Sequence, residues 1–285
     1  MCTILKFKSC VGRNFDYDIS NNEEIITIEK DEFNNKYAII GICTGLVNDY
    51  PLLYDGMNEC GLVCGGLAFV GNAKYFRYQE DKFNVPSFDF TFQVLANNKS
   101  IKEVKEWLDD VNIWCEPFSD EIPNTDLHWF IADEKESIIV EQTNDGLKWY
   151  DGEVMTNNPP YPNQLTNCKI TNQMIGCNLF ETYNSRGKET DGLSGGYSSY
   201  ERFCKVTYLK EQLEKVTDKF NQLSETFHLL GSVEQVYGVT SVDNGFEYTI
   251  YSTVYDMKNR TMWIKTYDKI CPNNYTLRGS ERVSL

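Results

Sequence analysis

Short runs of alternating apolar and polar residues recur along this 285-residue chain, and they constrain its fold more than any other feature. A side-chain period of two is typical of β-strands with one buried face. The residues 11–16 read as a turn, and residues 44–51 and 116–123 read as loops. Strands are predicted at residues 3–8, 24–28, 37–42, 62–69, 127–132, 137–142, 147–150, 153–156, 248–256 and 261–267, with a further strand after the turn.

Helices are predicted between these groups of strands. Ser100 with Glu103, and Ser198 with Glu201, have the spacing of a capping box, which satisfies free N–H groups at a helix start. They predict a helix at 100–110 and another from 198 onward, and a third is predicted at 223–236. In contrast, residues 161–196 show no period and predict a long irregular segment. Strands and helices in separate clusters indicate an α+β fold, with residues 1–285 as a single domain.

Composition limits the classes of partner and cofactor. A net charge of −15 repels a phosphate backbone, so nucleic acid is not an expected partner. The sequence has no apolar stretch of about 18 residues and no secretory signal, from which we expect no membrane association and a cytoplasmic location. Ten cysteines without a C-x-x-C pair, and only two histidines, predict no metal site and no cofactor. Most of these cysteines are expected to be small buried side chains.

Cys2 directly follows the initiator methionine, and removal of Met1 makes it the first residue. A terminal cysteine carries a thiol and an α-amine, whose reference pKa values of about 8.5 and about 7.7–8.0 lie close together. The amine can therefore take the thiol proton, as in enzymes whose terminal threonine is activated by its own amino group. The dipeptide alone does not separate this interpretation from a chance cysteine at position 2.

Seven motifs in order resemble landmarks of the choloylglycine hydrolase family, which holds the bile salt hydrolases and penicillin V acylases. The motifs run from residue 1 to beyond residue 200, and together they are far more specific than any one of them. They are Met1-Cys2-Thr3, Gly12-Arg13-Asn14-Phe15-Asp16, Asp55-Gly56-Met57-Asn58-Glu59 with Gly61-Leu62, Asn124-Thr125-Asp126-Leu127-His128-Trp129, Val140-Glu141-Gln142-Thr143, Thr156-Asn157-Asn158-Pro159 and Arg202-Phe203.

The resemblance implies an N-terminal-nucleophile hydrolase, an αββα four-layer sandwich that cleaves linear non-peptide amides. By this resemblance Cys2 is the nucleophile, and Arg13 lies near its sulfur and favours the thiolate. Asp16 accepts a hydrogen bond from the terminal amine, Asn157 donates its side-chain amide to the oxyanion, and Arg202 completes the polar cluster. Taken singly, these residues also fit a surface ion pair, a turn before proline and a helix surface.

The resemblance also implies a substrate class and an assembly. Phe15, Tyr17, Ala68 and Phe69, with the two predicted loops, are expected to line an apolar groove for the acyl group. Conjugated bile salts are the first expectation; penicillin V, another N-acyl amide or an acyl-homoserine lactone is the alternative, and a silent relative that binds amphiphiles is the non-enzyme alternative. A homotetramer is expected, although the 158–201 segment is shorter than the family's. His128 is expected to be a supporting or core residue.

Overall fold

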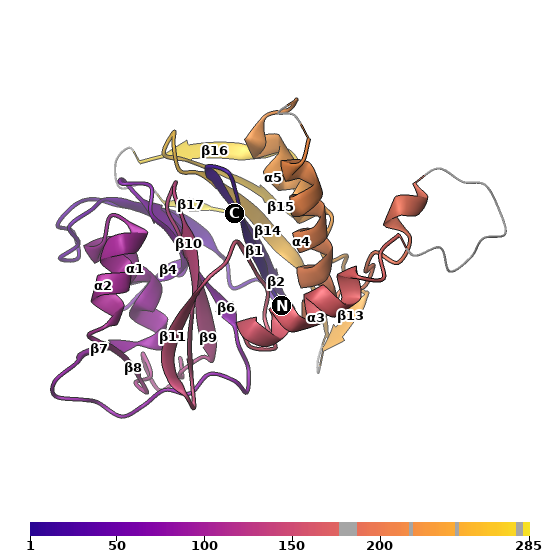
Figure 1. The fold of residues 1–285 in the computed structure, drawn as a ribbon. Coiled ribbons are helices and arrows are strands. Elements are labelled where there is room, and N and C mark those ends of the chain that lie inside the picture. Colours follow the sequence, from indigo (N-terminus) through magenta and orange to yellow (C-terminus); the bar gives the residue numbers. More distant parts are fainter. Residues whose placement is uncertain (177–186, 217–218, 243–244, 278–281) are drawn as a thin grey trace.

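Two antiparallel sheets stack face to face in the computed structural model, which describes residues 1–176, 187–216, 219–242, 245–277 and 282–285 (Figure 1). The first sheet has the strand order β12-β1-β2-β14-β15-β16, with β13 paired to β14. Its strands are β1 (Thr3–Phe7), β2 (Cys10–Tyr17), β12 (Val154–Met155), β13 (Thr240–Val242), β14 (Gly245–Asp256), β15 (Thr261–Thr266) and β16 (Asn273–Thr276).

The second sheet has the strand order β11-β10-β9-β6-β5-β4-β3-β17. A separate parallel pair, β7 (Phe83–Pro86) with β8 (Val111–Trp114), lies outside both sheets. The strands of the second sheet are β3 (Glu24–Ile28), β4 (Ile39–Val47), β5 (Tyr50–Asn58), β6 (Val63–Ala68), β9 (Leu127–Ala132), β10 (Ser137–Thr143), β11 (Gly146–Asp151) and β17 (Arg282–Ser284).

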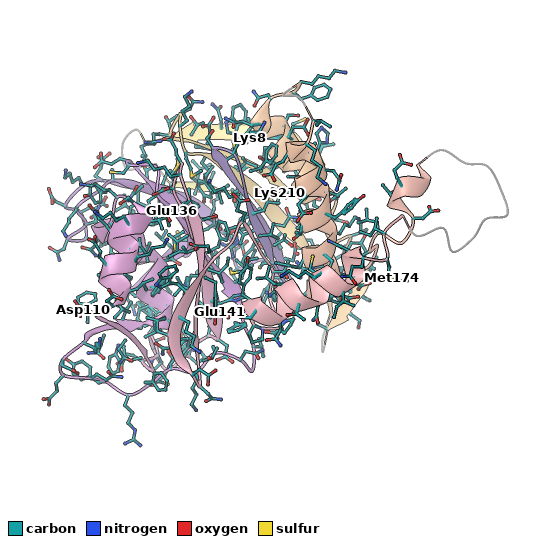
Figure 2. The ribbon with its side chains drawn as sticks, in the orientation of Figure 1. Lys8, Asp110, Glu136, Glu141, Met174 and Lys210 are labelled. Atoms are coloured by element: carbon teal, nitrogen blue, oxygen red, sulfur yellow. The ribbon has the colours of Figure 1, made fainter. Side chains whose placement is uncertain are left out.

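Helices cover the outer face of each sheet (Figure 1). The helices α1 (Phe90–Asn97) and α2 (Ile101–Leu108) pack on the second sheet, and α3 (Tyr161–Asn172), α4 (Ser199–Glu214) and α5 (Gln222–Gly231) lie on the side of the first. Short 3₁₀ turns occupy Ser87–Asp89 and Lys188–Thr190. Side chains fill the space between the layers (Figure 2). The arrangement confirms the predicted α+β class and the four-layer αββα sandwich.

Both predicted capping boxes begin helices where expected. The Ser100 side chain accepts the Glu103 N–H before α2, and the Ser198 side chain accepts the Glu201 N–H before α4. Strands β3 and β9 have the predicted bounds. The third helix, α5, ends at Gly231, five residues before the predicted end at residue 236. A capping box was sufficient to predict where these two helices begin, and alternation of apolar and polar residues was sufficient to predict these two strands.

The predicted turn at residues 11–16 is wrong, because this segment is part of β2. The chain turns earlier, at Lys8 and Ser9, and Phe7 pairs with Cys10. Glycine is common in turns, but Gly12 lies within the strand, where α5 packs closely against it. A Cβ atom at Gly12 would lie 2.6 Å from Cγ2 of Thr226 in α5. The glycine therefore allows the helix to approach the sheet closely.

Two other predictions of irregular structure are corrected. Residues 44–51 form the tip of the β4–β5 hairpin, where Asn48 and Asp49 adopt φ values of 52° and 60° as a two-residue turn requires. Residues 161–172 form α3, whose buried residues Tyr161, Gln164 and Cys168 recur at helical spacing. Its polar composition concealed this stripe. Residues 177–186 of the predicted irregular segment lie outside the described residues.

Candidate active site

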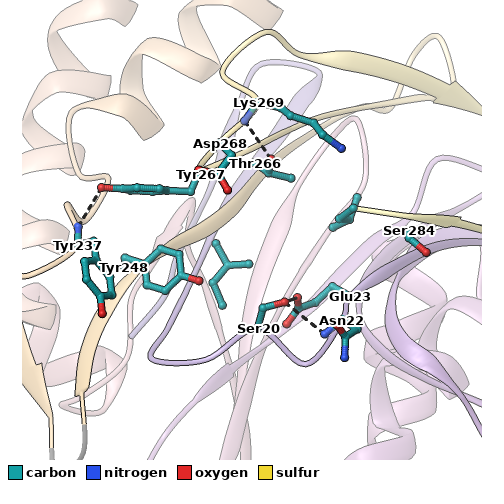
Figure 3. Close-up of a pocket in the computed structure, with 12 residues that line it drawn as sticks. Ser20, Asn22, Glu23, Tyr237, Tyr248, Thr266, Tyr267, Asp268, Lys269 and Ser284 are labelled. Carbon is teal, nitrogen blue, oxygen red and sulfur yellow. Dashed lines mark hydrogen bonds between the residues drawn. The ribbon is translucent and has the colours of Figure 1, made fainter.

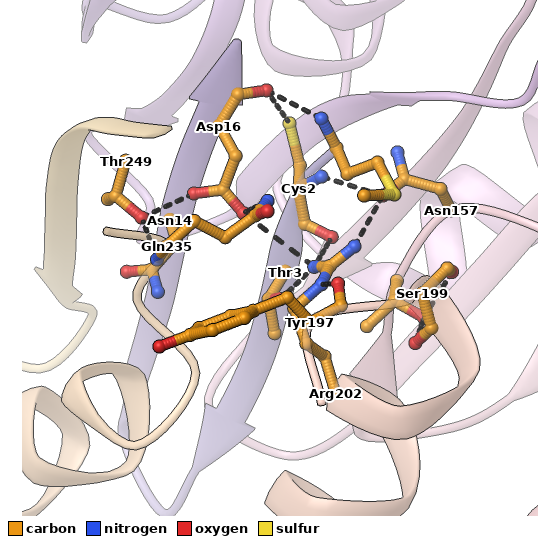
Figure 4. Close-up of polar contacts among 12 residues, drawn as sticks. Cys2, Thr3, Asn14, Asp16, Asn157, Tyr197, Ser199, Arg202, Gln235 and Thr249 are labelled. Atoms are coloured by element: carbon orange, nitrogen blue, oxygen red, sulfur yellow. Dashed lines mark hydrogen bonds and ion pairs between the residues drawn. The ribbon is translucent and has the colours of Figure 1, made fainter. Parts of the chain in front are cut away.

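Cys2 directly precedes β1, which lies between β12 and β2 in the first sheet, and it is buried, with 4% of its surface exposed. Its backbone N–H donates to Oδ1 of Asn157 over 2.6 Å, and its Sγ lies 3.8 Å from the backbone oxygen of Asp16 (Figure 4). With Met1 in place, the Cys2 nitrogen is a peptide amide. The same nitrogen becomes an α-amine when Met1 is removed, so the structure already places a hydrogen-bond acceptor beside it.

Asn157 follows β12, the strand that pairs with β1, and this pairing brings it to Cys2. Its Nδ2 donates to the backbone oxygen of Ala68 over 2.9 Å. Gln164 of α3 holds the backbone here, because its Nε2 donates to the oxygens of Asn157 and Pro159 over 2.7 and 2.8 Å. Asn157 is thus fixed from both its side chain and its main chain.

Arg202 lies in the first turn of α4 and is fully buried. Its Nη1 donates to the backbone oxygen of Cys2 over 2.6 Å, and its Nη2 donates to Oδ1 of Asn157 over 3.0 Å (Figure 4). The Asp16 carboxylate lies 3.7 Å from Nη1. Burial lowers the pKa of Arg202, and the negative charge of Asp16 opposes that shift. This guanidinium joins the start of the chain to residue 157.

Asp16 is also buried, with 1% of its surface exposed. Thr249 Oγ1 and Gln235 Nε2 donate to the two carboxylate oxygens over 2.6 and 2.9 Å. Burial raises the pKa of Asp16, and Arg202 is the foremost of the groups that oppose this shift. In the untrimmed chain the amine of Met1 donates to the backbone oxygen of Asp16 over 2.8 Å. The expected bond from the Cys2 α-amine to Asp16 belongs to the trimmed chain and stays a prediction.

Arg13 projects from the other face of β2 into the space between the sheets. It forms an ion pair with Asp55 of β5, and its Nη2 donates to the backbone oxygen of Gly66 over 2.7 Å. Tyr251 and Tyr255 of β14 also donate to the Asp55 carboxylate. Burial acts to lower the pKa of Arg13, but Tyr251, Asp55 and Cys2 together raise it above its ordinary value. A permanent cation therefore lies beside the thiol.

The expected substrate-binding residues fall into different environments. Phe15 stacks on Tyr251 with ring centroids 4.9 Å apart, and Tyr17 is 45% exposed. Ala68 lies at the end of β6 beside Asn157. Phe69, however, has no exposed surface and stacks on His128 with centroids 4.3 Å apart. A residue with no exposed surface does not line a groove, so we no longer expect Phe69 to contact substrate.

Further residues support this cluster, and most of them were not singled out from the sequence. His128 was expected to have a supporting role, and its Nδ1 lies 3.2 Å from Oε1 of Glu141, which also accepts the N–H of Tyr161. Asp55 was noted only as part of a motif, although an acidic residue within an apolar strand indicates a buried partner. The remaining contacts had no local signal in the sequence. They are made by Thr3, Gln164, Gln235, Glu247, Thr249, Tyr251 and Tyr255.

A separate surface pocket lies where β2–β3, β14–β15 and the last residues of the chain meet (Figure 3). Tyr248, Tyr267 and Glu23 are among the residues that line it, and the Tyr237 N–H donates to the Tyr267 hydroxyl over 3.1 Å. Neither Cys2 nor Asn157 is among its described lining residues. Within the described ranges, no group of three or more His, Cys, Asp or Glu residues could hold a metal ion, and no helix is long and apolar enough to cross a bilayer.

Two antiparallel sheets between helical layers form the αββα fold of the N-terminal-nucleophile hydrolases, and here a cysteine directly precedes the first strand. The residues 2–281 match the family model described as linear amide C–N hydrolases, choloylglycine hydrolase family. The chain therefore belongs to the choloylglycine hydrolase family and is a hydrolase of linear amide C–N bonds.

Curated relatives and solved structures agree with this assignment. The chain is 38% identical to the bile salt hydrolase/transferase of Lactiplantibacillus plantarum, over 97% of this chain and 92% of that protein. It is 34% identical to the bile salt hydrolase/transferase of Clostridium perfringens, over 99% and 95%. The C2A variant of conjugated bile acid hydrolase from Clostridium perfringens superposes with a TM-score of 0.90 at 33% identity, covering 100% of this chain and 96% of that one. Penicillin V acylase from Agrobacterium tumefaciens shares the fold, with a TM-score of 0.75 at 19% identity over 96% and 84%.

Proposed function

We propose that this chain deconjugates bile salts, by hydrolysing the amide between the steroid acyl group and glycine or taurine. The observation that carries the proposal is the convergence of Asn157, Arg202 and Asp16 on Cys2 from three separate elements. The names of the relatives at 38% and 34% identity support the choice of substrate. Whether the acyl group is a steroid rests on those names, since the polar cluster itself is suited to any linear amide.

Cys2 acts as nucleophile once Met1 has been removed. Its α-amine, held at Oδ1 of Asn157, takes the thiol proton, and the sulfur attacks the amide carbonyl. The C–N bond breaks, the amine leaves with a proton from the α-ammonium group, and a thioester on Cys2 remains. Water then attacks the thioester, the α-amine takes the water proton, and the free acid and the thiol are released. Arg13 holds a positive charge beside the sulfur throughout.

Asn157 is proposed to stabilise the oxyanion of both tetrahedral intermediates. Its Oδ1 accepts from Cys2 and Arg202, and this fixes the amide so that Nδ2 is the free donor end. One hydrogen of Nδ2 is used by the backbone oxygen of Ala68, and an NH₂ group carries two. The second hydrogen is proposed to bond the oxyanion, and Phe15, Tyr17 and Ala68 are proposed to contact the acyl group.

We infer that residues 1–285 act as one domain in a homo-oligomer, with a tetramer as the first expectation. The family match over residues 2–281 supports a single unit. The nine cysteines within the described part of the chain are free thiols, which supports the proposal of a cytoplasmic location, because the cytoplasm is reducing. Light scattering after size-exclusion chromatography gives the assembly directly, because a tetramer has four times the 33.0 kDa mass of the chain.

The function is tested with a panel of amides and two variants of Cys2. Purified protein is incubated with glycine- and taurine-conjugated cholates, penicillin V and an acyl-homoserine lactone, and the released amine is quantified. We expect the conjugated cholates to be cleaved fastest, and Cys2→Ala and Cys2→Ser to release no amine above background. Cleavage of penicillin V alone would show that the substrate is a penicillin and not a bile salt. If no amide in the panel is cleaved, an amphiphile-binding protein is favoured. Full hydrolysis by both variants would refute the nucleophile.

A further inference from the structure

The α-ammonium group of Met1 occupies a defined site beside the nucleophile. Its nitrogen donates to the backbone oxygen of Asp16 over 2.8 Å and lies 2.9 Å from Oε1 of Glu247 in β14. Only 12% of the Glu247 side chain is exposed. The structure therefore contains a bound primary ammonium group, held by one carboxylate and one carbonyl oxygen, and its charge and donors match those of any primary amine.

The position of this site relates it to the reaction. The Asp16 oxygen that accepts from the Met1 ammonium also lies 3.8 Å from Sγ of Cys2, so the ammonium and the sulfur share one acceptor. Oε2 of Glu247 is buried and, within the described part of the chain, has no hydrogen-bond partner. Glu247 therefore has the capacity to accept a further hydrogen bond from a ligand at this position.

Removal of Met1 takes the methionine ammonium group out of this site. The Cys2 nitrogen, which becomes the new terminus, has its own acceptor, Oδ1 of Asn157 at 2.6 Å. Glu247 then lacks the ammonium group that it binds in the untrimmed chain, which favours binding of a cation from solution. The group released beside Cys2 in the proposed reaction is a primary amine.

We propose that Glu247 and the Asp16 carbonyl form the binding site for the amino group of the amine that leaves the acyl group or attacks it. This inference rests on the proposed function for its chemistry. In the leaving direction, the amine nitrogen takes one proton from the Cys2 α-ammonium as the C–N bond breaks, takes a second proton from solvent, and binds Glu247 as an ammonium group. In the reverse direction, the bound ammonium gives a proton to the Cys2 α-amine, and its nitrogen attacks the thioester carbon. The C–N bond forms, the C–S bond then breaks, and the sulfur takes a proton from the α-ammonium group. The regenerated α-amine takes the second proton from the new amide nitrogen and releases it to solvent.

The test compares two acceptor amines whose amino groups differ in charge. Acyl-enzyme formed from a conjugated cholate is offered glycine, whose amino group is an ammonium group at pH 7, and hydroxylamine, which is largely uncharged there. The acylglycine and hydroxamate products are quantified by mass spectrometry. In Glu247→Gln we expect the ratio of acylglycine to hydroxamate to fall at least ten-fold, because only glycine needs the carboxylate. Both products come from the same acyl-enzyme, so the ratio does not depend on how active the variant is.

Glu211→Gln is the matched control, since Glu211 is exposed on α4 and the same charge is removed. Its product ratio is expected to equal that of the parent protein. An unchanged ratio in Glu247→Gln would overturn the proposal, as would an equal fall in Glu211→Gln. A loss of both products in proportion would assign Glu247 a structural role and would also overturn it.

Direct binding separates this inference from the proposed function. Glycine methyl ester, a primary ammonium without an acid group, is titrated into trimmed protein without any acyl substrate and followed by NMR. We expect saturable binding to the parent protein and to Glu211→Gln, and at least ten-fold weaker binding to Glu247→Gln. Absence of binding to the parent protein would contradict the amine site even if bile salts are hydrolysed. Binding without hydrolysis of any conjugate would instead contradict only the proposed substrate.

Discussion

Arg202 and Asn157 are joined through a single oxygen atom, because Nη2 of Arg202 and the N–H of Cys2 both donate to Oδ1 of Asn157, over 3.0 and 2.6 Å. Two donors on one oxygen leave no ambiguity about which end of the amide carries hydrogens. Nδ2 must therefore point toward Ala68. An arginine from α4 thus sets the direction in which an asparagine after β12 can donate.

Replacement of Asn157 is expected to affect catalysis more than folding. Asn157→Ala removes the donor proposed for the oxyanion, and the loss of one such donor typically lowers kcat by about 10²–10³-fold. The neighbouring Asn158→Ala is the control, because its Nδ2 bonds the backbone oxygen of Val70 and it makes no hydrogen bond to Cys2. Steady-state kinetics on a conjugated cholate measure the difference. Equal kcat values for the two variants would show that Asn157 donates no hydrogen bond to the transition state.

Asp55 is expected to be among the residues that most stabilise the fold. Its carboxylate is fully buried and is shared by Arg13, Tyr251 and Tyr255. Asp55→Asn leaves the charge of Arg13 without compensation, which should lower the free energy of unfolding by about 3–5 kcal/mol.

Tyr251→Phe is the matched variant for the same carboxylate. It removes one hydrogen bond to a charged group and keeps the ion pair, which should cost about 1.5–3 kcal/mol. Urea denaturation of both variants gives the comparison. Asp55→Asn is expected to be the less stable of the two, and the opposite order would show that the charge of Arg13 is compensated by other groups.

Stability at alkaline pH is expected to depend on Cys10. Burial, with the neighbouring Asp256 carboxylate, raises the pKa of Cys10 from 9.0 to about 12. Between these two values the unfolded chain loses the thiol proton and the folded chain keeps it, so the unfolded state binds fewer protons. The free energy of unfolding therefore falls as pH rises from 9 toward 12, by up to about 1.4 kcal/mol per pH unit from this group.

Cys10→Ala should flatten this part of the stability curve, as measured by chemical denaturation at a series of pH values. The slope is the relevant quantity, since the smaller side chain also changes the stability at every pH. Cys271→Ala serves as the control, because Cys271 is exposed and its loss should leave the slope unchanged. An unaltered slope in Cys10→Ala would mean that the thiol ionises in the folded state as readily as in the unfolded chain.

Local sequence patterns predicted the elements whose stability is local. Ser100 and Ser198 begin helices because a hydroxyl three residues before a glutamate satisfies free N–H groups whatever lies elsewhere in the fold. They did not predict that Gly12 belongs in a strand, because the reason is Thr226, which packs against it from α5. Helix α3 was missed for a related reason, since its stripe of Tyr161, Gln164 and Cys168 is identified as buried only by its neighbours in space.

In the candidate site, too, some residues could be predicted from the sequence, and the residues that contact them could not. Cys2, Arg13, Asp16, Asn157 and Arg202 were predicted through the resemblance to a family, and they lie together in the structure. Their supporting contacts could not be predicted, because Tyr251 and Tyr255 lie 196 and 200 residues from Asp55 in the sequence. The roles of the five residues in catalysis remain predictions, as does the contact of Phe15, Tyr17 and Ala68 with substrate.

The central claim is that the terminal cysteine supplies both the nucleophile and its base, and comparison of trimmed and untrimmed protein tests it most directly. Chain that retains Met1, obtained by inhibiting methionine aminopeptidase during expression, is separated from trimmed chain and identified by intact mass. Each form is then assayed on a conjugated cholate. In the untrimmed form the Cys2 nitrogen is an amide that cannot accept a proton, so the account predicts turnover by the trimmed form alone. Equal turnover by the form that keeps Met1 would contradict it.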